Sequence, residues 1–206
     1  MTVASLIRKP LTAITLGLSL ALSPVAAFAF DTNDAQALTQ DIADDVLSYI
    51  DAEISAGAKK ERFRQTMNRV ADVRTIARFA LGVSWRSATE AQQVAYVTAF
   101  EEYAANKYGR QFDEFESSGI EVGSALDAGR KGIVVNSRVV RPGQPAVAVE
   151  WQFSDRSGKP LLVDIIVEGI SLLTTERQEI GARLDARGGD IDKLIADLPA
   201  LGNAAS

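Results

Sequence analysis

The period of the hydrophobic pattern changes at Gly119, and this change restricts the possible folds more than any other feature of the sequence. Before Gly119, apolar residues recur every three or four positions, which is typical of one face of a helix. After it they alternate with polar residues, which is typical of a strand with one buried face. We therefore expect residues 30–118 to be mainly helical, 119–175 to form a sheet, and 176–198 to return to helices. The predicted fold class is α+β, with N-terminal helices packed on a curved, four-stranded antiparallel sheet.

Local signals in the first half predict where the helices begin and end. The apolar stripe from Leu38 to Ile54 is expected to stop at Gly57, and Gly82 is expected to cap the third helix. Thr89 and Gln92 have the spacing of a capping box, in which each side chain accepts a hydrogen bond from the other residue's backbone. A long helix is therefore expected to follow them.

Short turns are expected to join the strands into a meander. In the first strand, strict alternation puts four residues on one face: Ile120, Val122, Ser124 and Leu126. In the fourth strand, alternation puts Asp164 on the solvated face, as an antiparallel sheet with one buried face requires. The segment 170–175 is expected to continue as an extended piece, and Asp190 is expected to cap the last helix.

The first 29 residues have the pattern of a secretory signal. Arg8 and Lys9 precede an apolar run, 11–22, and the small-x-small site 27–29 follows it. The apolar run is shorter than the ~20 residues that span a bilayer as a helix, and a cleavage pattern follows it. We predict that residues 1–29 are removed and that 30–206 form one exported domain in a bacterial periplasm. A retained N-terminal anchor is the alternative.

The composition excludes several classes of function. The chain has no Cys and no His, so it lacks disulfides, thiol nucleophiles, the usual general base near neutral pH and the commonest ligands of zinc. Removing the two positive charges of the first 29 residues lowers the formal net charge from −5 to −7. An acidic surface argues against nucleic acid as a partner. We expect no metal and no cofactor, and most enzyme classes are excluded.

Two stretches carry a resemblance to a known family. Residues 71–86 read ADVRTIARFALGVSWR and are followed by Ala88, Thr89 and Gln92. Residues 167–174 read VEGISLLT and are followed by Arg177, Gly188, Gly189 and the sequence DKLI at 192–195. In order and spacing these stretches resemble the MlaC family, also called toluene-tolerance or ABC-transporter auxiliary proteins. The resemblance covers nearly the whole mature chain and implies a nuclear-transport-factor-2-like cone with added helices.

The resemblance also implies a function. It implies a periplasmic phospholipid carrier that shuttles lipid between an outer-membrane lipoprotein complex and an inner-membrane ABC transporter with an MCE-domain ring, maintaining outer-membrane lipid asymmetry. A carrier that docks on two partners is expected to be a monomer. Four positions depart from the residue types common in the family: Tyr96, Ala104, Glu176 and Ile180. If they line the cavity, the capacity for acyl chains differs.

A lipid carrier must enclose acyl tails, because each methylene left in water costs ~0.8 kcal/mol. We expect apolar residues of the third helix, the long helix and the strands to line a cavity: Ile76, Phe79, Ala80, Leu81, Trp85, Phe100, Tyr103, Tyr108, Val135, Val149, Trp151, Val163, Ile165 and Val167. Arg74, Arg78 and Arg86 cluster around the third helix and are candidates for docking an acidic partner. A solvated helix face explains these arginines equally well.

Two other functions remain open at this stage. The same apolar residues would fill a solid core in a periplasmic adaptor that binds proteins and carries no lipid. An isomerase would need a carboxylate base, for which Asp164 with Tyr103 or Tyr108 are the candidates. Asp164 is expected to face away from the apolar pocket, which disfavours the enzyme.

Overall fold

The computed structural model describes residues 30–203, so the predicted signal of residues 1–29 lies outside the described residues. The helices of the described part are α1 (Thr32–Ile50), α2 (Ala56–Val70), α3 (Val73–Leu81), α4 (Glu90–Gly109), α5 (Leu172–Asp185) and α6 (Ile191–Leu201), with short 3₁₀ turns η1 (Gly82–Arg86), η2 (Phe112–Phe115) and η3 (Gly129–Lys131). The strands are β1 (Gly119–Asp127), β2 (Ile133–Val140), β3 (Val147–Ser154), β4 (Leu161–Val167) and β5 (Ile170–Ser171). Between residues 30 and 203, no helix is both long and apolar enough to cross a membrane.

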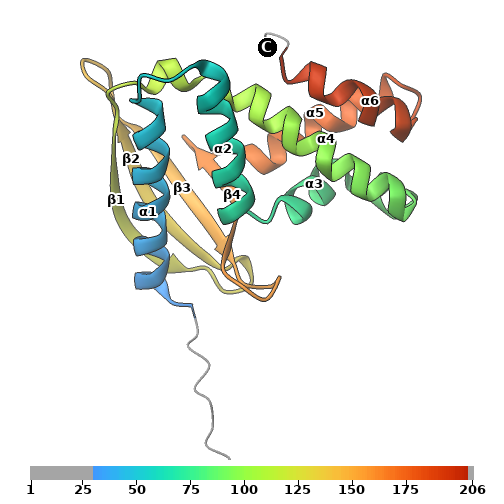
Figure 1. Cartoon of the computed structure of the whole chain (residues 1–206). Helices are drawn as coiled ribbons and strands as arrows, with labels where there is room; N and C mark the ends of the chain where they lie inside the picture. The colour runs from blue at the N-terminus through green and yellow to red at the C-terminus, as the bar shows by residue number, and fades with distance from the viewer. Residues whose placement is uncertain (1–29, 204–206) are drawn as a thin grey trace, which may run out of the picture.

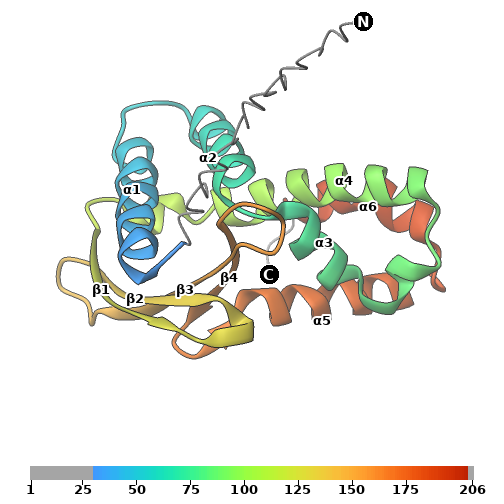
Figure 2. The same ribbon diagram turned by 90° about the horizontal axis from the view of Figure 1, so that it is seen from below.

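The five strands form one antiparallel meander in the order β1-β2-β3-β4-β5. Helices α1 and α2 lie over one face of this sheet, and α3 to α6 form a second helical layer beyond the β4 edge (Figures 1 and 2). The α+β fold with helices on an antiparallel sheet is therefore confirmed. The one addition is β5, two residues long, which pairs with the end of β4.

The predicted caps of α3 and α4 are confirmed. Gly82 caps α3 with a φ of 66°, a left-handed conformation that suits glycine. Thr89 and Gln92 form the expected capping box at the start of α4. The predicted end of the first helix is wrong. It ends at Ile50, and Gly57 lies in the first turn of α2, because the Ser55 hydroxyl accepts a hydrogen bond from the Ala58 N–H and starts a new helix there.

The predicted extended piece over 170–175 is also wrong, because α5 already begins at Leu172. Two side chains satisfy the N–H groups at its first turn. The Ser171 hydroxyl accepts from the Thr174 N–H, and the Asp164 carboxylate accepts from the Leu173 N–H at 2.9 Å. Asp164 also accepts a hydrogen bond from the Ser171 hydroxyl, at 2.6 Å. The carboxylate on β4 thus determines where the first C-terminal helix starts.

A bulge changes the alternation in β1. Val122 pairs with Ser137 and Ala125 pairs with Val135, so two residues of β1 oppose the single residue between those partners on β2. As a result Ala125 packs against the core, and Leu126, which was expected on the buried face, is 65% exposed. A bulge shifts side chains to the opposite face, and Gly123, an isolated glycine within the strand pattern, is the one local signal for it.

The core is solid within the second helical layer. Large side chains from α4, α5 and α6 are almost completely buried there: Tyr96, Tyr103, Ile180, Leu194 and Leu198. Trp85 packs edge-on against Tyr96, with the rings 6.4 Å apart. Between the sheet and the helices, by contrast, the apolar side chains leave a space.

Candidate ligand cavity

An apolar cavity of about 480 Å³ lies between the sheet and the helices that cover it. Helices α1 to α5 and strands β1 to β4 all contribute side chains to its lining. The lining is almost entirely apolar, and among the described residues that form it there is no Lys or Arg. An apolar space of this size is suited to hydrocarbon and not to a charged group.

The sheet supplies the floor of the cavity. Val149 and Trp151 alternate on β3, and Ile165 and Val167 oppose them on β4 in register. Trp151 is held in place because its indole N–H donates to the Ser137 hydroxyl at 2.8 Å, and this hydroxyl donates to the Val149 carbonyl at 3.1 Å. The indole thereby turns its apolar rings to the cavity with its one polar atom paired.

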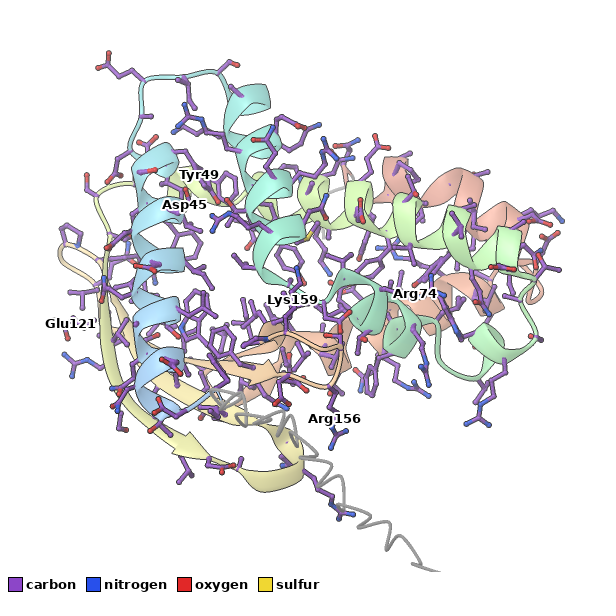
Figure 3. The ribbon with its side chains drawn as sticks, turned by 60° about the horizontal axis from the view of Figure 1, so that its bottom comes forward. Asp45, Tyr49, Arg74, Glu121, Arg156 and Lys159 are labelled. Carbon is purple, nitrogen blue, oxygen red and sulfur yellow. The ribbon has the colours of Figure 1, made fainter. Side chains whose placement is uncertain are left out.

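Helices α1 and α2 supply the roof. Their apolar side chains in the lining recur at helical spacing: Ile42, Val46 and Ile50 on α1, and Phe63, Met67 and Val70 on α2. Polar contacts connect the two helices, since Asp45 accepts hydrogen bonds from the Thr66 hydroxyl, at 2.8 Å, and from the Arg69 guanidinium. Figure 3 shows Asp45 and Tyr49 on the side of α1 that faces α2. The roof is therefore a helix pair held by a few polar contacts above an apolar space.

The cavity ends where it meets the second helical layer. Ile76 of α3, Phe100 of α4 and Glu176 of α5 are the last lining residues in that direction on their helices. One turn further into the layer, Ala80, Tyr96 and Ile180 are buried and do not line the cavity. The second helical layer therefore forms a closed end wall.

A buried ion pair lies at this end wall. The Lys107 ammonium is 2.8 Å from Oε1 of Glu176, and the exposed fractions of the two side chains are 12% and 4%. The Tyr108 hydroxyl donates to the same Oε1 at 2.6 Å, and Lys107 also reaches Glu179 at 2.8 Å. Oε2 of Glu176 is buried and has no hydrogen-bond partner within residues 30–203.

The electrostatics of this cluster keep its hydroxyls protonated. Burial raises the pKa of Tyr108 far above its ordinary value, and the nearby charge of Glu176 raises it further. Burial also raises the pKa of Glu179, but hydrogen bonds from Lys107 and Tyr103 and the charges of Lys107 and Arg183 outweigh it and leave this pKa below its ordinary value. The cluster therefore holds Tyr108 as a hydrogen-bond donor to Glu176.

The structure brings eight of the fourteen predicted lining residues to the cavity: Ile76, Phe100, Tyr108, Val149, Trp151, Val163, Ile165 and Val167. Six do not reach it: Phe79, Ala80, Leu81, Trp85, Tyr103 and Val135. Of the four positions that depart from the family pattern, Ala104 and Glu176 line the cavity, whereas Tyr96 and Ile180 lie in the solid layer behind it.

The orientation of α3 explains most of these exclusions. Val73 and Ile76 line the cavity, whereas Ala80 and Leu81 pack within the layer of α3 to α6. Phe79 is on the outer side, 41% exposed, with the Arg177 guanidinium 5.0 Å above its ring. The apolar stripe of a helix that packs between two layers does not reveal which part of it faces the cavity.

The remaining exclusions have separate causes. Trp85 packs on Tyr96 inside the helical layer, and the Tyr103 hydroxyl donates to Glu179 at 3.1 Å. Val135 is fully buried in the core beside its register partner Trp151. The contributions of α1 and α2 were missed by sequence reasoning, because their stripes are equally compatible with solid packing.

The three arginines of the candidate docking set lie on the surface. Arg74, Arg78 and Arg86 are exposed on α3 and η1, and the Arg74 guanidinium lies 5.3 Å from the centre of the Trp85 ring. Figure 3 shows Arg74 on the side of the molecule formed by α3. Arg177 of α5 lies over the ring of Phe79 on α3 and adds a fourth exposed arginine beside this helix. These groups are solvated and are not part of the cavity.

The residues proposed for an enzymatic reaction are already paired. Asp164 borders the cavity, which differs from the expectation that it faces away, but its carboxylate accepts hydrogen bonds from Ser171 and Leu173 at the start of α5. Tyr108 donates to Glu176 and Tyr103 to Glu179. Acidic side chains do not gather between residues 30 and 203 in any group of three that is able to hold a metal ion.

Fold and cavity together define a class of α+β protein in which helices and a curved antiparallel sheet enclose an apolar ligand space. A family model described as MlaC protein matches residues 33–200, and the chain belongs to this family. A solved structure with a similar fold is the phospholipid-binding protein from Ralstonia solanacearum in complex with a phospholipid. It aligns with a TM-score of 0.69 at 22% sequence identity, over 82% of this chain and 96% of that chain.

Proposed function

We propose that this protein is a periplasmic phospholipid carrier, exported by a signal in residues 1–29 that is then cleaved. It shuttles lipid between an outer-membrane lipoprotein complex and an inner-membrane ABC transporter with an MCE-domain ring. Its role is to maintain the lipid asymmetry of the outer membrane. The observation that carries the proposal is the apolar cavity of about 480 Å³ in a member of the MlaC family. The fold neighbour that binds a phospholipid adds support.

The size of the cavity agrees with an acyl chain as cargo. A volume of about 480 Å³ is in the range of ligand pockets. Enclosing an acyl chain of about 16 methylenes saves on the order of 12 kcal/mol relative to water. Since Lys and Arg are absent from the described lining, the phosphate headgroup stays at the surface while the tail is enclosed.

The proposal assigns two sets of residues. The eight predicted residues that line the cavity contact acyl chains, and Glu176 and Tyr108 are held at its inner end. The exposed Arg74, Arg78 and Arg86 dock on acidic surfaces of the membrane complexes. Binding and transfer, not catalysis, are the proposed activity, because Asp164 and Tyr108, the candidates for an enzymatic reaction, are engaged in structural hydrogen bonds.

The proposal is tested by native mass spectrometry of the mature protein, purified from a periplasmic extract without detergent, followed by lipid extraction. We expect phospholipid at about one molecule per protein. An apo mass that persists after incubation with phospholipid vesicles would refute the carrier and favour the adaptor that binds only proteins.

A matched pair of variants connects the lipid to the cavity. Val149→Glu puts a carboxylate on the cavity floor, whereas Leu126→Glu puts one on the exposed side of β1. Because the cavity has space for the new side chain and its water, Val149→Glu is expected to abolish lipid loading and to keep cooperative unfolding. Leu126→Glu is expected to keep both. If the core were solid, Val149→Glu would unfold and the wild type would contain no lipid, which would refute the carrier.

A further inference from the structure

We propose that the buried pair of Glu176 and Lys107, with the Tyr108 hydroxyl, is a polar stop that sets the length of the acyl chain accepted at the closed end of the cavity. This inference rests on the proposed function, because it assumes that an acyl chain occupies the cavity. It goes further by assigning chain-length selection to named residues.

Glu176 and Tyr108 lie on the wall of the cavity, where an acyl chain would contact them. Glu176 is on the cavity wall at the last turn of α5 that lines it, and Tyr108 lines the facing side on α4. A chain that runs along α5 toward the second helical layer therefore meets Glu176 as the last lining side chain of that helix. The described lining contains two charged side chains, Asp164 and Glu176, and Asp164 is engaged at the first turn of α5, so Glu176 is the charged side chain that lies furthest along this helix.

An ion pair resists displacement by an acyl chain more than an apolar wall does. Apolar side chains make room by changing rotamer and repacking, which proteins tolerate well. Glu176 has no such freedom. Its Oε1 accepts from both Lys107 and Tyr108, and moving it away leaves the Glu176 carboxylate without its cation and the Tyr108 hydroxyl without its acceptor in an apolar space. The second carboxylate oxygen already lacks a partner among the described residues, so the site has no spare donor to compensate.

Magnitudes indicate that the stop is sharp. Each methylene that leaves water favours binding by about fourfold. Separating a buried ion pair disfavours it by more than about a hundredfold. One or two extra methylenes do not offset that loss, so a chain that is slightly too long leaves its surplus carbons in water. We therefore expect a sharp upper limit to the length of the bound acyl chain.

The decisive experiment replaces the pair by apolar residues of similar volume. In Lys107→Met/Glu176→Leu both charges are removed together, so no unpaired charge remains buried. The mature protein is purified with its lipid, and the lengths of the extracted acyl chains are measured by mass spectrometry. We expect the distribution to move toward longer chains by at least two carbons relative to the wild type.

The matched control removes another ion pair that lies away from the cavity. Arg187 and Asp197 connect the end of α5 to α6 with their charged atoms 2.9 Å apart, and neither lines the cavity. Arg187→Met/Asp197→Leu makes the same kind of change, one cation and one carboxylate replaced by apolar residues, but is expected to leave chain length as in the wild type. A longer-chain shift in both double variants would overturn the assignment.

A second variant changes the end wall in the opposite direction and does not alter any charge. Ala104 is a small, buried lining residue one turn before Tyr108 on α4. Ala104→Leu adds three carbons there and is expected to shift the bound chains shorter by two to three carbons, or to lower loading with the longest chains, whether or not the double variant folds.

The outcomes separate the two proposals. Wild-type protein without phospholipid refutes the proposed function. Wild-type protein that carries phospholipid, with the same chain lengths in the wild type, Lys107→Met/Glu176→Leu and Ala104→Leu, refutes the polar stop and leaves the carrier function intact.

Discussion

Removing either partner of the buried pair of Lys107 and Glu176 is expected to destabilise the protein, but by different amounts. Lys107→Met removes the one cation that Glu176 contacts in the described structure and leaves its carboxylate buried without a counter-charge. Glu176→Leu leaves Lys107 with Glu179, 2.8 Å away and half-exposed to solvent. We therefore expect Lys107→Met to destabilise the protein more than Glu176→Leu does.

The expected magnitudes follow from the burial of the pair. Breaking a buried pair and leaving one charge unpaired costs about 3–5 kcal/mol. For a chain of this size each kcal/mol lowers the midpoint of thermal unfolding by roughly 2–4 °C. Lys107→Met is thus expected to lose about 6–20 °C. Glu176→Leu leaves the Tyr108 hydroxyl without an acceptor and is expected to cost only about 1–3 kcal/mol.

The assay is thermal unfolding of delipidated protein at pH 7, followed by circular dichroism, because bound lipid would stabilise each variant to a different extent. Lys107→Met/Glu176→Leu is expected to recover most of the loss of Lys107→Met, since it removes the unpaired carboxylate. Equal or greater destabilisation by Glu176→Leu than by Lys107→Met would refute the reasoning that the unpaired carboxylate dominates the cost.

Three further predictions concern other parts of the fold. The chain has four tyrosines, all with a pKa raised mainly by burial, to about 12 for Tyr49: Tyr49, Tyr96, Tyr103 and Tyr108. Because these tyrosines ionise first in the unfolded state, their contribution to stability is complete below pH ~10 and declines above it. Phenolate absorbance is therefore expected to appear together with unfolding, and gradual titration of the folded protein would contradict this. Gly132→Ala is expected to prevent folding, since a Cβ there lies 1.9 Å from the Phe153 carbonyl oxygen. Gly129 has a φ of 62° and open space around it, so Gly129→Ala is expected to fold with a small loss of stability. Equal losses of stability in chemical denaturation would argue against the clash. Ser137→Ala leaves the Trp151 indole N–H without its acceptor and is expected to cost about 1–3 kcal/mol, measured by urea unfolding; an unchanged midpoint would show that water replaces the hydroxyl.

Much of the fold was predictable because it depends on local patterns. The change of period at Gly119 separates helices from strands, since side chains repeat every 3.6 residues in one and every 2 in the other. Gly82, the Thr89 and Gln92 box, and Asp190 cap their helices as expected. These features involve residues a few positions apart, so the sequence carries them directly.

Predictions were wrong where a distant residue decides the local structure. Asp164 on β4 binds the Leu173 N–H, so α5 begins earlier than the local sequence indicates. In β1 the extra residue opposite β2 turns Leu126 to solvent and Ala125 to the core. Pairing between strands determines both outcomes, and a single strand contains no record of its partner's register.

By itself, the sequence determined the class of fold, the order of helices and sheet, and the apolar character of what they enclose. Only the tertiary structure decided that the space between the sheet and α1 to α5 is a cavity while the layer behind Phe100 and Glu176 is solid. The physical reason is that a hydrophobic pattern determines which side chains leave water, whereas emptiness depends on how surfaces distant in sequence fit together. The same fit places one buried ion pair at the end of an apolar space, which no periodicity in the chain predicts.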